Sequence, residues 1–188
     1  RGDDERVGAA VDWAALTITG EDVDRWYASG TSGPGFACAA NGKNPCAWGA
    51  LKELAAFARI PPRRRTARVR RAVTAGVEFL FSRDPLVADY PMAPYDTKPS
   101  QAWFRPGFPV AYVSDVLQTL EVLGELGHGR DERLRPALDW LEGLQDAQGR
   151  WPNRHPYHGK LWVDIDRQGA PSKWVTLRAC TALRAAYG

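Results

Sequence analysis

Apolar residues recur at three- and four-residue spacings in several stretches of the chain, a pattern typical of helices that bury one face. The most regular stretch is Arg135–Trp151, where Ala137, Leu138 and Leu141 fall on one face. We expect Gly149 to end this helix, since glycine readily adopts the backbone that follows a helix terminus. The pattern predicts helices at Arg6–Leu16, Cys46–Arg59, from Thr66 to Phe81, Ala111–Leu126, from Arg135 onward, and Lys173–Tyr187.

Residues that favour helix starts precede several of these stretches. Thr66 and Ser172 are placed to cap the helices that follow them, because a side-chain oxygen can accept from free N–H groups there. Asn44 followed by Pro45 predicts a third capped start. Three loops rich in Gly, Pro and polar residues separate the helices, at Thr17–Lys43 (with a turn of helix expected at Glu21–Tyr27), Pro85–Pro109 and Pro152–Pro171.

Helices of one type begin near residues 46, 111 and 173, a spacing of roughly 60 to 65 residues that indicates a repeat. Each helix pair leaves apolar surface uncovered, so neighbouring pairs are expected to stack. We therefore predict one all-α domain over residues 1–188. Its parts are an outer helix and long loop (1–45), two repeats (46–109 and 110–171) and a terminal inner helix (172–188).

The segment Arg135–Trp151 resembles the QW repeat of squalene–hopene cyclases and related prenyltransferase and squalene-oxidase repeat proteins. Gln145 corresponds to the repeat's glutamine, which we expect to tie the helix end to the turn, and Trp151 to the tryptophan that packs on a neighbouring helix. The matching residues are Arg135, Ala137, Trp140, Leu141, Gln145, Gly149 and Trp151.

The resemblance implies an α/α toroid, in which inner helices line a cavity and outer helices ring it. The chain supplies about two and a half helix pairs of such a ring. We expect either an absent N-terminal region, since the sequence opens at Arg1 without a Met, or a second copy in a homodimer to supply more, or else an open arc. The implied ligand is an isoprenoid or another hydrophobic small molecule.

Cyclases of this family use a DxDD motif whose central aspartate protonates an alkene. The segment resembling it is YVSDVLQTL, where Asp115 matches the last aspartate while Val113 and Ser114 replace acids. Asp164 and Asp166 in VDID are the other candidate acid pair. The structural alternative is a loop carboxylate pair that caps a helix or binds Lys173 or Arg167.

Protein prenyltransferases with this fold hold zinc by Asp, Cys and His. Cys46 and Asp115 open inner helices here, and His155 and His158 lie in a loop, but no pair has metal-ligand spacing on one helix. We therefore predict no metal and no other cofactor. The three cysteines, Cys38, Cys46 and Cys180, are expected to be reduced thiols, with Cys46 and Cys180 in apolar helix faces.

Aromatic residues gather at the predicted starts of inner helices and in the adjoining loops. In a toroid these helix ends share one mouth, so the aromatics could face a ligand, or they could simply fill the ring. The set is Trp48, Tyr112, Trp174, Trp103, Phe104, Phe108 and Trp162.

Charge adds one further feature. The net charge is only +3, and no base-reading motif is present, so we predict no nucleic-acid partner. Arginines from Arg63 to Arg71 form a basic stretch, interpreted as a solvated face, with a diphosphate, an acidic partner or an anionic membrane surface as alternatives. No apolar run reaches the roughly 18 residues of a membrane span, and we expect a cytoplasmic protein with, at most, peripheral membrane contact.

Two classes of function follow. The first is a terpenoid cyclase- or prenyltransferase-like protein that acts on an isoprenoid in an aromatic-lined cavity. The second is a toroid-derived binding or scaffold protein that lacks the proton donor. A weaker alternative is a polysaccharide-degrading α/α toroid, in which paired acids and loop histidines would attack sugars.

Overall fold

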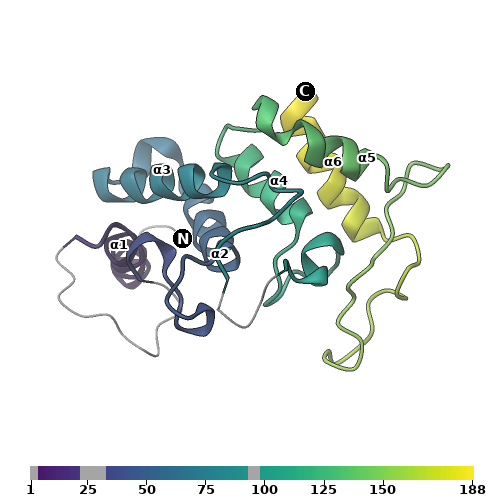
Figure 1. Cartoon of the computed structure of the whole chain (residues 1–188), viewed down its shortest axis with the longest axis horizontal. Helices are drawn as coiled ribbons and strands as arrows, with labels where there is room; N and C mark the ends of the chain where they lie inside the picture. The colour runs from purple at the N-terminus through teal and green to yellow at the C-terminus, as the bar shows by residue number, and fades with distance from the viewer. Residues whose placement is uncertain (1–3, 22–32, 93–97) are drawn as a thin grey trace. The chain divides into compact units, whose positions relative to one another are not determined.

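The computed structural model describes residues 4–21, 33–92 and 98–188. Across these residues the chain is helical, with no β-strand, which confirms the all-α expectation. The α-helices are α1 (Glu5–Thr19), α2 (Ala47–Ala58), α3 (Ala67–Phe81), α4 (Val116–Glu125), α5 (Arg135–Glu142) and α6 (Lys173–Tyr187) (Figure 1). Short 3₁₀ turns are η1 (Pro34–Phe36), η2 (Ala39–Asn41), η3 (Pro62–Arg64), η4 (Gln101–Phe104) and η5 (Glu132–Leu134).

The chain divides into two compact units. Unit 1 comprises residues 1–83 and 89–98, and carries α1, α2 and α3. Unit 2 comprises residues 84–88 and 99–188, and carries α4, α5 and α6. Among the described residues, no helix combines the length and the apolar character needed to cross a bilayer.

In unit 1, α3 is the central helix, and both α1 and α2 pack against it (Figure 1). Gly76 on α3 permits close packing, because a Cβ there would lie 2.7 Å from Leu54 of α2 and 2.9 Å from Phe36. Ion pairs add to this packing at the α1–α3 interface. Arg68 binds Asp12 at 2.7 Å, and both Arg68 and Arg71 bind Glu21.

The helix starts in unit 1 confirm one predicted cap and correct another. Thr66 caps α3, its hydroxyl accepting from the Val69 N–H at 3.2 Å. Asn44 does not cap α2, since its side-chain amide donates to the Met92 carbonyl. Cys46 is the cap instead, and its sulfur accepts from the Gly49 N–H at 3.5 Å.

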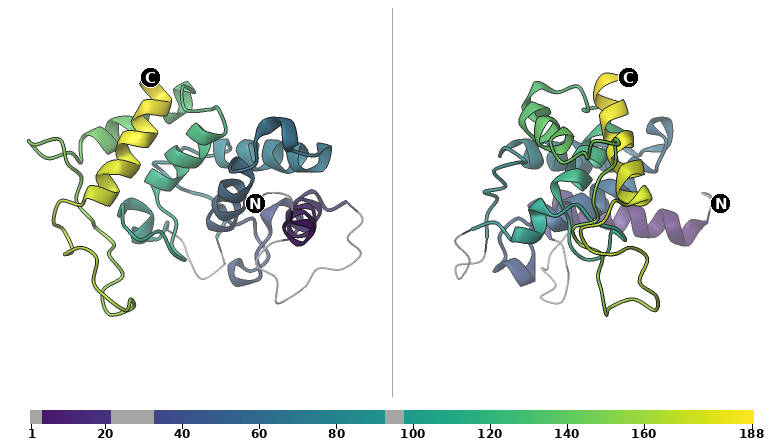
Figure 2. Two further views of the ribbon diagram at one scale, coloured as in Figure 1. Left: turned by 180° about the vertical axis from the view of Figure 1, so that it is seen from behind. Right: turned by 90° about the vertical axis from the view of Figure 1, so that its right-hand side faces the viewer.

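In unit 2, α4 packs along α6, and α5 packs on α4. Helices α4 and α6 run side by side in the same direction, with their amino-terminal ends on one side (Figures 1 and 2). Gly124 near the end of α4 makes the close approach possible, because a Cβ there would lie 2.8 Å from Ala185 of α6. Ser172 caps α6 as predicted, accepting from the Trp174 and Val175 N–H groups.

Helix α4 begins later than predicted. Residues 111–115 are not helical, and Asp115 is the cap, with its carboxylate accepting from the Gln118 N–H at 2.6 Å. The segment before this cap is bonded to a distant loop, because the Val113 N–H donates to the Tyr157 hydroxyl. This contact spans 44 residues, so the local apolar pattern could not reveal it.

Helix α5 ends at Glu142, well before Gly149, and the predicted role of Gln145 is wrong. The Gln145 side chain is exposed, and no hydrogen bond of its amide is found among the described residues. Trp151 ties the helix end instead, being buried and donating its indole N–H to the Leu141 carbonyl at 2.7 Å. Asp146 organises the turn by accepting from the Gln148 and Arg150 N–H groups.

We expect Trp151→Phe to lower the free energy of unfolding by about 1–3 kcal/mol, since it keeps most of the ring but leaves the Leu141 carbonyl buried without its donor. Chemical denaturation measures the loss. Trp162→Phe is the matched control, because this side chain is fully exposed and should leave stability unchanged. Equal stability of Trp151→Phe and the parent protein would show that the indole bond is unimportant.

Candidate functional site

The polar centre of unit 2 lies where the amino-terminal end of α4 meets the second turn of α6. Arg178 of α6 is buried and reaches two carboxylates, Asp115 at 3.2 Å and Glu121 at 2.6 Å. Its guanidinium also donates to the Gly107 carbonyl at 2.6 Å. One arginine thus joins α4, α6 and the segment before α4.

The carboxylate of Asp115 is surrounded by donors. It accepts from the Gln118 N–H, from the Gly107 N–H at 3.3 Å and from two nitrogens of Arg178. Its exposed fraction is 6 %. Asp115 was predicted to be catalytic. Its carboxylate oxygens instead accept hydrogen bonds from the protein's own donors, which indicates a structural role.

Burial acts in opposite directions on the pKa values of Glu121 and Arg178. Burial raises the pKa of Glu121, outweighing the attraction of Arg178, and the nearby Asp115 raises it further. Burial alone would lower the pKa of Arg178, but Asp115 and Glu121 more than offset this effect and raise it. The cluster therefore keeps its cation, while Glu121 carries the tendency to take up a proton.

The predicted acid pair Asp164 and Asp166 is not a pair in the structure. Asp166 accepts from the Ser172 hydroxyl at 2.5 Å and from the Asn153 amide at 3.2 Å, which fixes the capping residue of α6. Asp164 instead contacts the His158 ring, 3.1 Å from Nδ1. Asp166 therefore holds the capping residue Ser172 but does not itself cap the helix, and no bond found among the described residues joins either carboxylate to Lys173 or Arg167.

The aromatic candidates divide into exposed and buried groups. Trp174 stacks on Phe108, with ring centroids 5.1 Å apart, and the Lys173 ammonium lies 5.0 Å from its centroid. Tyr112 is 73 % exposed, Trp174 is 37 % exposed, and Trp162 is fully exposed. Three of the predicted ligand-facing rings, all in unit 2, are therefore accessible, and Trp174 is already seated against a second ring.

Trp103 is placed in the core of unit 2 and not on a ligand-facing surface. Its side chain is 3 % exposed, and its indole N–H donates to the Pro85 carbonyl at 2.9 Å. Phe104 is half-buried and lines a shallow hollow on unit 2 with Trp140. Trp48 is half-buried at the start of α2 in unit 1.

His155 and Tyr157 adjoin the helix ends of unit 2. Their rings meet edge to face, with centroids 4.5 Å apart. Burial lowers the pKa of His155, and the positive charge of Arg105 lowers it further. The backbone of His155 is also fixed, because a Cβ at Gly107 would lie 2.5 Å from its carbonyl oxygen, so only glycine permits this approach.

Sequence analysis missed the residues that organise this centre. Arg178 interrupts the buried apolar face of α6 between Val175, Ala179 and Ala182, and a charge at such a position indicates a buried partner. Asn153, fully buried in the loop, bonds to both the N–H and the carbonyl of Phe108. No local pattern marked Asn153, since Phe108 lies 45 residues away in the sequence.

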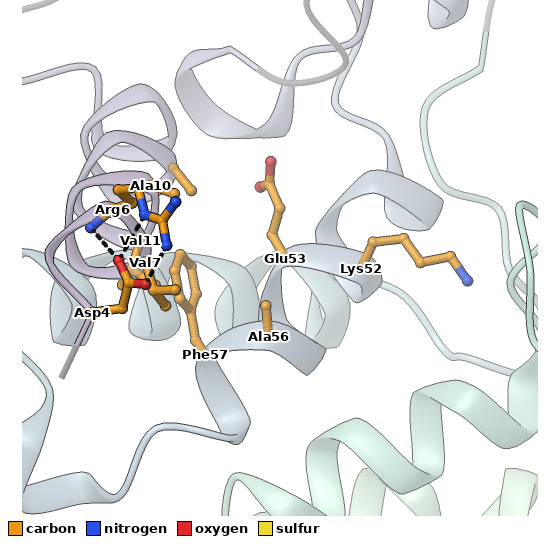
Figure 3. Close-up of a pocket in the computed structure, with 10 residues that line it drawn as sticks. Asp4, Arg6, Val7, Ala10, Val11, Lys52, Glu53, Ala56 and Phe57 are labelled. Atoms are coloured by element: carbon orange, nitrogen blue, oxygen red, sulfur yellow. Dashed lines mark hydrogen bonds and ion pairs between the residues drawn. The ribbon is translucent and has the colours of Figure 1, made fainter. Parts of the chain in front are cut away.

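Unit 1 contains a separate apolar groove of about 610 Å³ between α1 and α2 (Figure 3). Val7 and Val11 of α1 face Phe57 of α2 across it, while Lys52 points away from the α1 side chains (Figure 3). The arginine stretch is partly used inside the unit, because Arg68 and Arg71 bind carboxylates near α1. That use was not among the predicted alternatives.

Comparisons with known proteins add no family assignment. No family model matches the chain, and no curated protein or solved structure matches it. Over residues 4–21, 33–92 and 98–188, no group of three or more His, Cys, Asp or Glu side chains is arranged to hold a metal ion.

We expect Arg178→Met to lower the free energy of unfolding by about 3–5 kcal/mol at neutral pH, because it leaves two buried carboxylates without a cation. Chemical denaturation at neutral pH measures the loss. Arg184→Met, an exposed change on the same helix, should alter stability by less than about 0.5 kcal/mol.

Glu121→Gln tests the raised pKa of Glu121. A carboxyl whose folded pKa lies above its ordinary value of 4.5 contributes stability below that pH and loses it as the pH rises through the folded pKa. The stability of Glu121→Gln relative to the parent should therefore improve between pH 4.5 and the folded pKa, then level off. Glu132→Gln, an exposed change, should show no such trend, and a flat difference for Glu121→Gln would contradict the assigned direction.

Proposed function

We propose that this protein binds an isoprenoid or a comparable apolar ligand through the aromatic side chains at the amino-terminal ends of α4 and α6. The observation that carries the proposal is the exposure of Tyr112 and Trp174 beside this helix pair, with Trp174 stacked on Phe108. Exposed rings cost free energy in water, and an apolar ligand would recover it by covering them.

The arrangement of helices supports a partial α/α toroid as the framework for this binding. In unit 2, α4 and α6 are the predicted inner helices, and they lie side by side and parallel. In unit 1, the predicted outer helix α1 packs against α3, which follows the predicted inner helix α2. Contact between helices of successive pairs is what stacked helical hairpins require.

Binding without protonation is favoured over cyclisation. A class II cyclase needs a carboxylic acid that faces the substrate and donates a proton. Asp115 faces Arg178 and backbone N–H groups, Asp166 faces Ser172, and Asp164 contacts His158. The three predicted catalytic acids thus have partners within the protein.

The Lys173 ammonium beside Trp174 suggests how the ligand would be oriented. Lys173 lies 5.0 Å from the Trp174 ring centroid, where a polar or anionic end of an otherwise apolar ligand could meet it. A free isoprenoid alcohol and its diphosphate therefore form an informative pair of probes. We expect both to bind, with the diphosphate binding more tightly at low salt.

Trp174→Ala should weaken the binding of farnesol and farnesyl diphosphate by about tenfold, because an aromatic contact is worth on the order of 1 kcal/mol beyond its area. Tryptophan fluorescence and thermal stabilisation by the ligands measure the change. Trp13→Ala, an exposed tryptophan of α1 in unit 1, is the matched control and should bind normally. Equal weakening by both changes, or no binding by the parent, would refute the proposed surface.

Incubation with prenyl diphosphates and with squalene, followed by product analysis, separates binding from conversion. We expect no cyclised product. A product that disappears in Asp164→Asn, with ligand binding retained, would instead assign a catalytic acid to the loop and overturn the non-catalytic proposal.

A further inference from the structure

Two cysteines, Cys38 and Cys46, lie on neighbouring segments of the turn that precedes α2. The chain doubles back between Phe36 and Cys46, and Ala37 and Pro45 form an isolated antiparallel bridge. The Cys38 N–H donates to the Asn44 carbonyl at 3.0 Å, and the Cys46 N–H donates to the Phe36 carbonyl at 2.9 Å. The main chain thus holds both cysteine backbones at fixed positions on neighbouring segments.

The bridge places the two side chains on one face. Asn44 lies opposite Cys38, and Cys46 follows Asn44 by two residues, so Cys38 and Cys46 are diagonal neighbours on that face. Burial raises the pKa of the Cys46 thiol, and the adjacent Cys38 thiol raises it further.

We propose that Cys38 and Cys46 are a dithiol–disulfide pair that exchanges with low-molecular-weight disulfides. The Cys46 thiolate attacks the small disulfide, its S–S bond breaks, and one small thiolate leaves while a mixed disulfide forms on Cys46. The Cys38 thiolate then attacks the Cys46 sulfur and expels the second small thiolate. The pair loses two electrons and two protons, which appear in the two small thiols released.

Cys46 is the entry point for this exchange. Cys38 is buried, with an exposed fraction of 8 %, whereas Cys46 is half-exposed and caps α2, where its sulfur accepts from the Gly49 N–H. A helix amino terminus stabilises a thiolate, but the raised pKa keeps most of the Cys46 thiol protonated at neutral pH. The reaction rate should therefore rise with pH above neutrality.

Cys180 provides an internal control for reactivity. It is exposed on α6 in unit 2, whereas Cys38 and Cys46 belong to unit 1. A small disulfide should leave a stable adduct on Cys180, since unit 2 contains no second cysteine to displace it. Retained adducts and internal disulfides are thus distinguishable by mass.

The folded chain is treated with excess dithiobis(nitrobenzoate), and released nitrothiolate and intact mass are measured. We expect one released nitrothiolate for each of the three cysteines, but only one retained adduct, on Cys180. Cys180→Ser should retain no adduct. Cys38→Ser and Cys46→Ser should each form no internal disulfide.

Three retained adducts on the parent protein would overturn the proposal, because they would show that the thiols at 38 and 46 react independently. So would a parent that modifies only Cys180 at pH 8 to 9. A second measurement is the melting temperature of Cys180→Ser with and without oxidation. Closing this short loop should raise it by about 5 °C, and the same oxidant should leave the melting temperature of Cys46→Ser, Cys180→Ser unchanged, because the remaining Cys38 is buried.

Discussion

Unit 2 is built on one buried cation. Arg178 donates to Asp115, to Glu121 and to the carbonyl of Gly107, and thereby connects the start of α4, its second turn and the preceding segment to α6. Burying a guanidinium is unfavourable unless nearly all of its donors are matched. The packing of α4 along α6 satisfies that constraint, because Asp115 at the cap of α4 and Glu121 in its second turn both reach Arg178.

Capping residues could be predicted from the sequence where the capping side chain bonds only to N–H groups of its own helix. Thr66 and Ser172 cap as expected because each hydroxyl needs only the N–H groups two or three residues ahead. Asn44 failed as a cap for the opposite reason. Its amide donates to the carbonyl of Met92, 48 residues away, and Pro45 remains in the bridge with Ala37, so Cys46 is the cap and α2 begins at Ala47.

The motif at the end of α5 shows the same limit. Trp151 was predicted to be buried, and it is, yet the bond that closes the helix end comes from its indole and not from Gln145. The Asp146 carboxylate accepts from the N–H groups of the turn, so the Gln145 amide is not needed to hold the turn. The sequence pattern therefore indicated where the tryptophan packs but not which hydrogen bonds form there. The same limit applies to the candidate site. Asp115 was predicted as a site residue, whereas its partner Arg178, 63 residues later, was not.

The bond from Trp103 to the Pro85 carbonyl bears on how the chain could be dissected. Residues 84–88 belong to unit 2, although residues 89–98, which follow them, belong to unit 1. A fragment that started at residue 99 would lose the acceptor of a buried indole, and one that started at residue 84 would carry a strip of the other unit. The segments of the two units thus alternate along the chain, so dividing the polypeptide at one position cannot give both units intact.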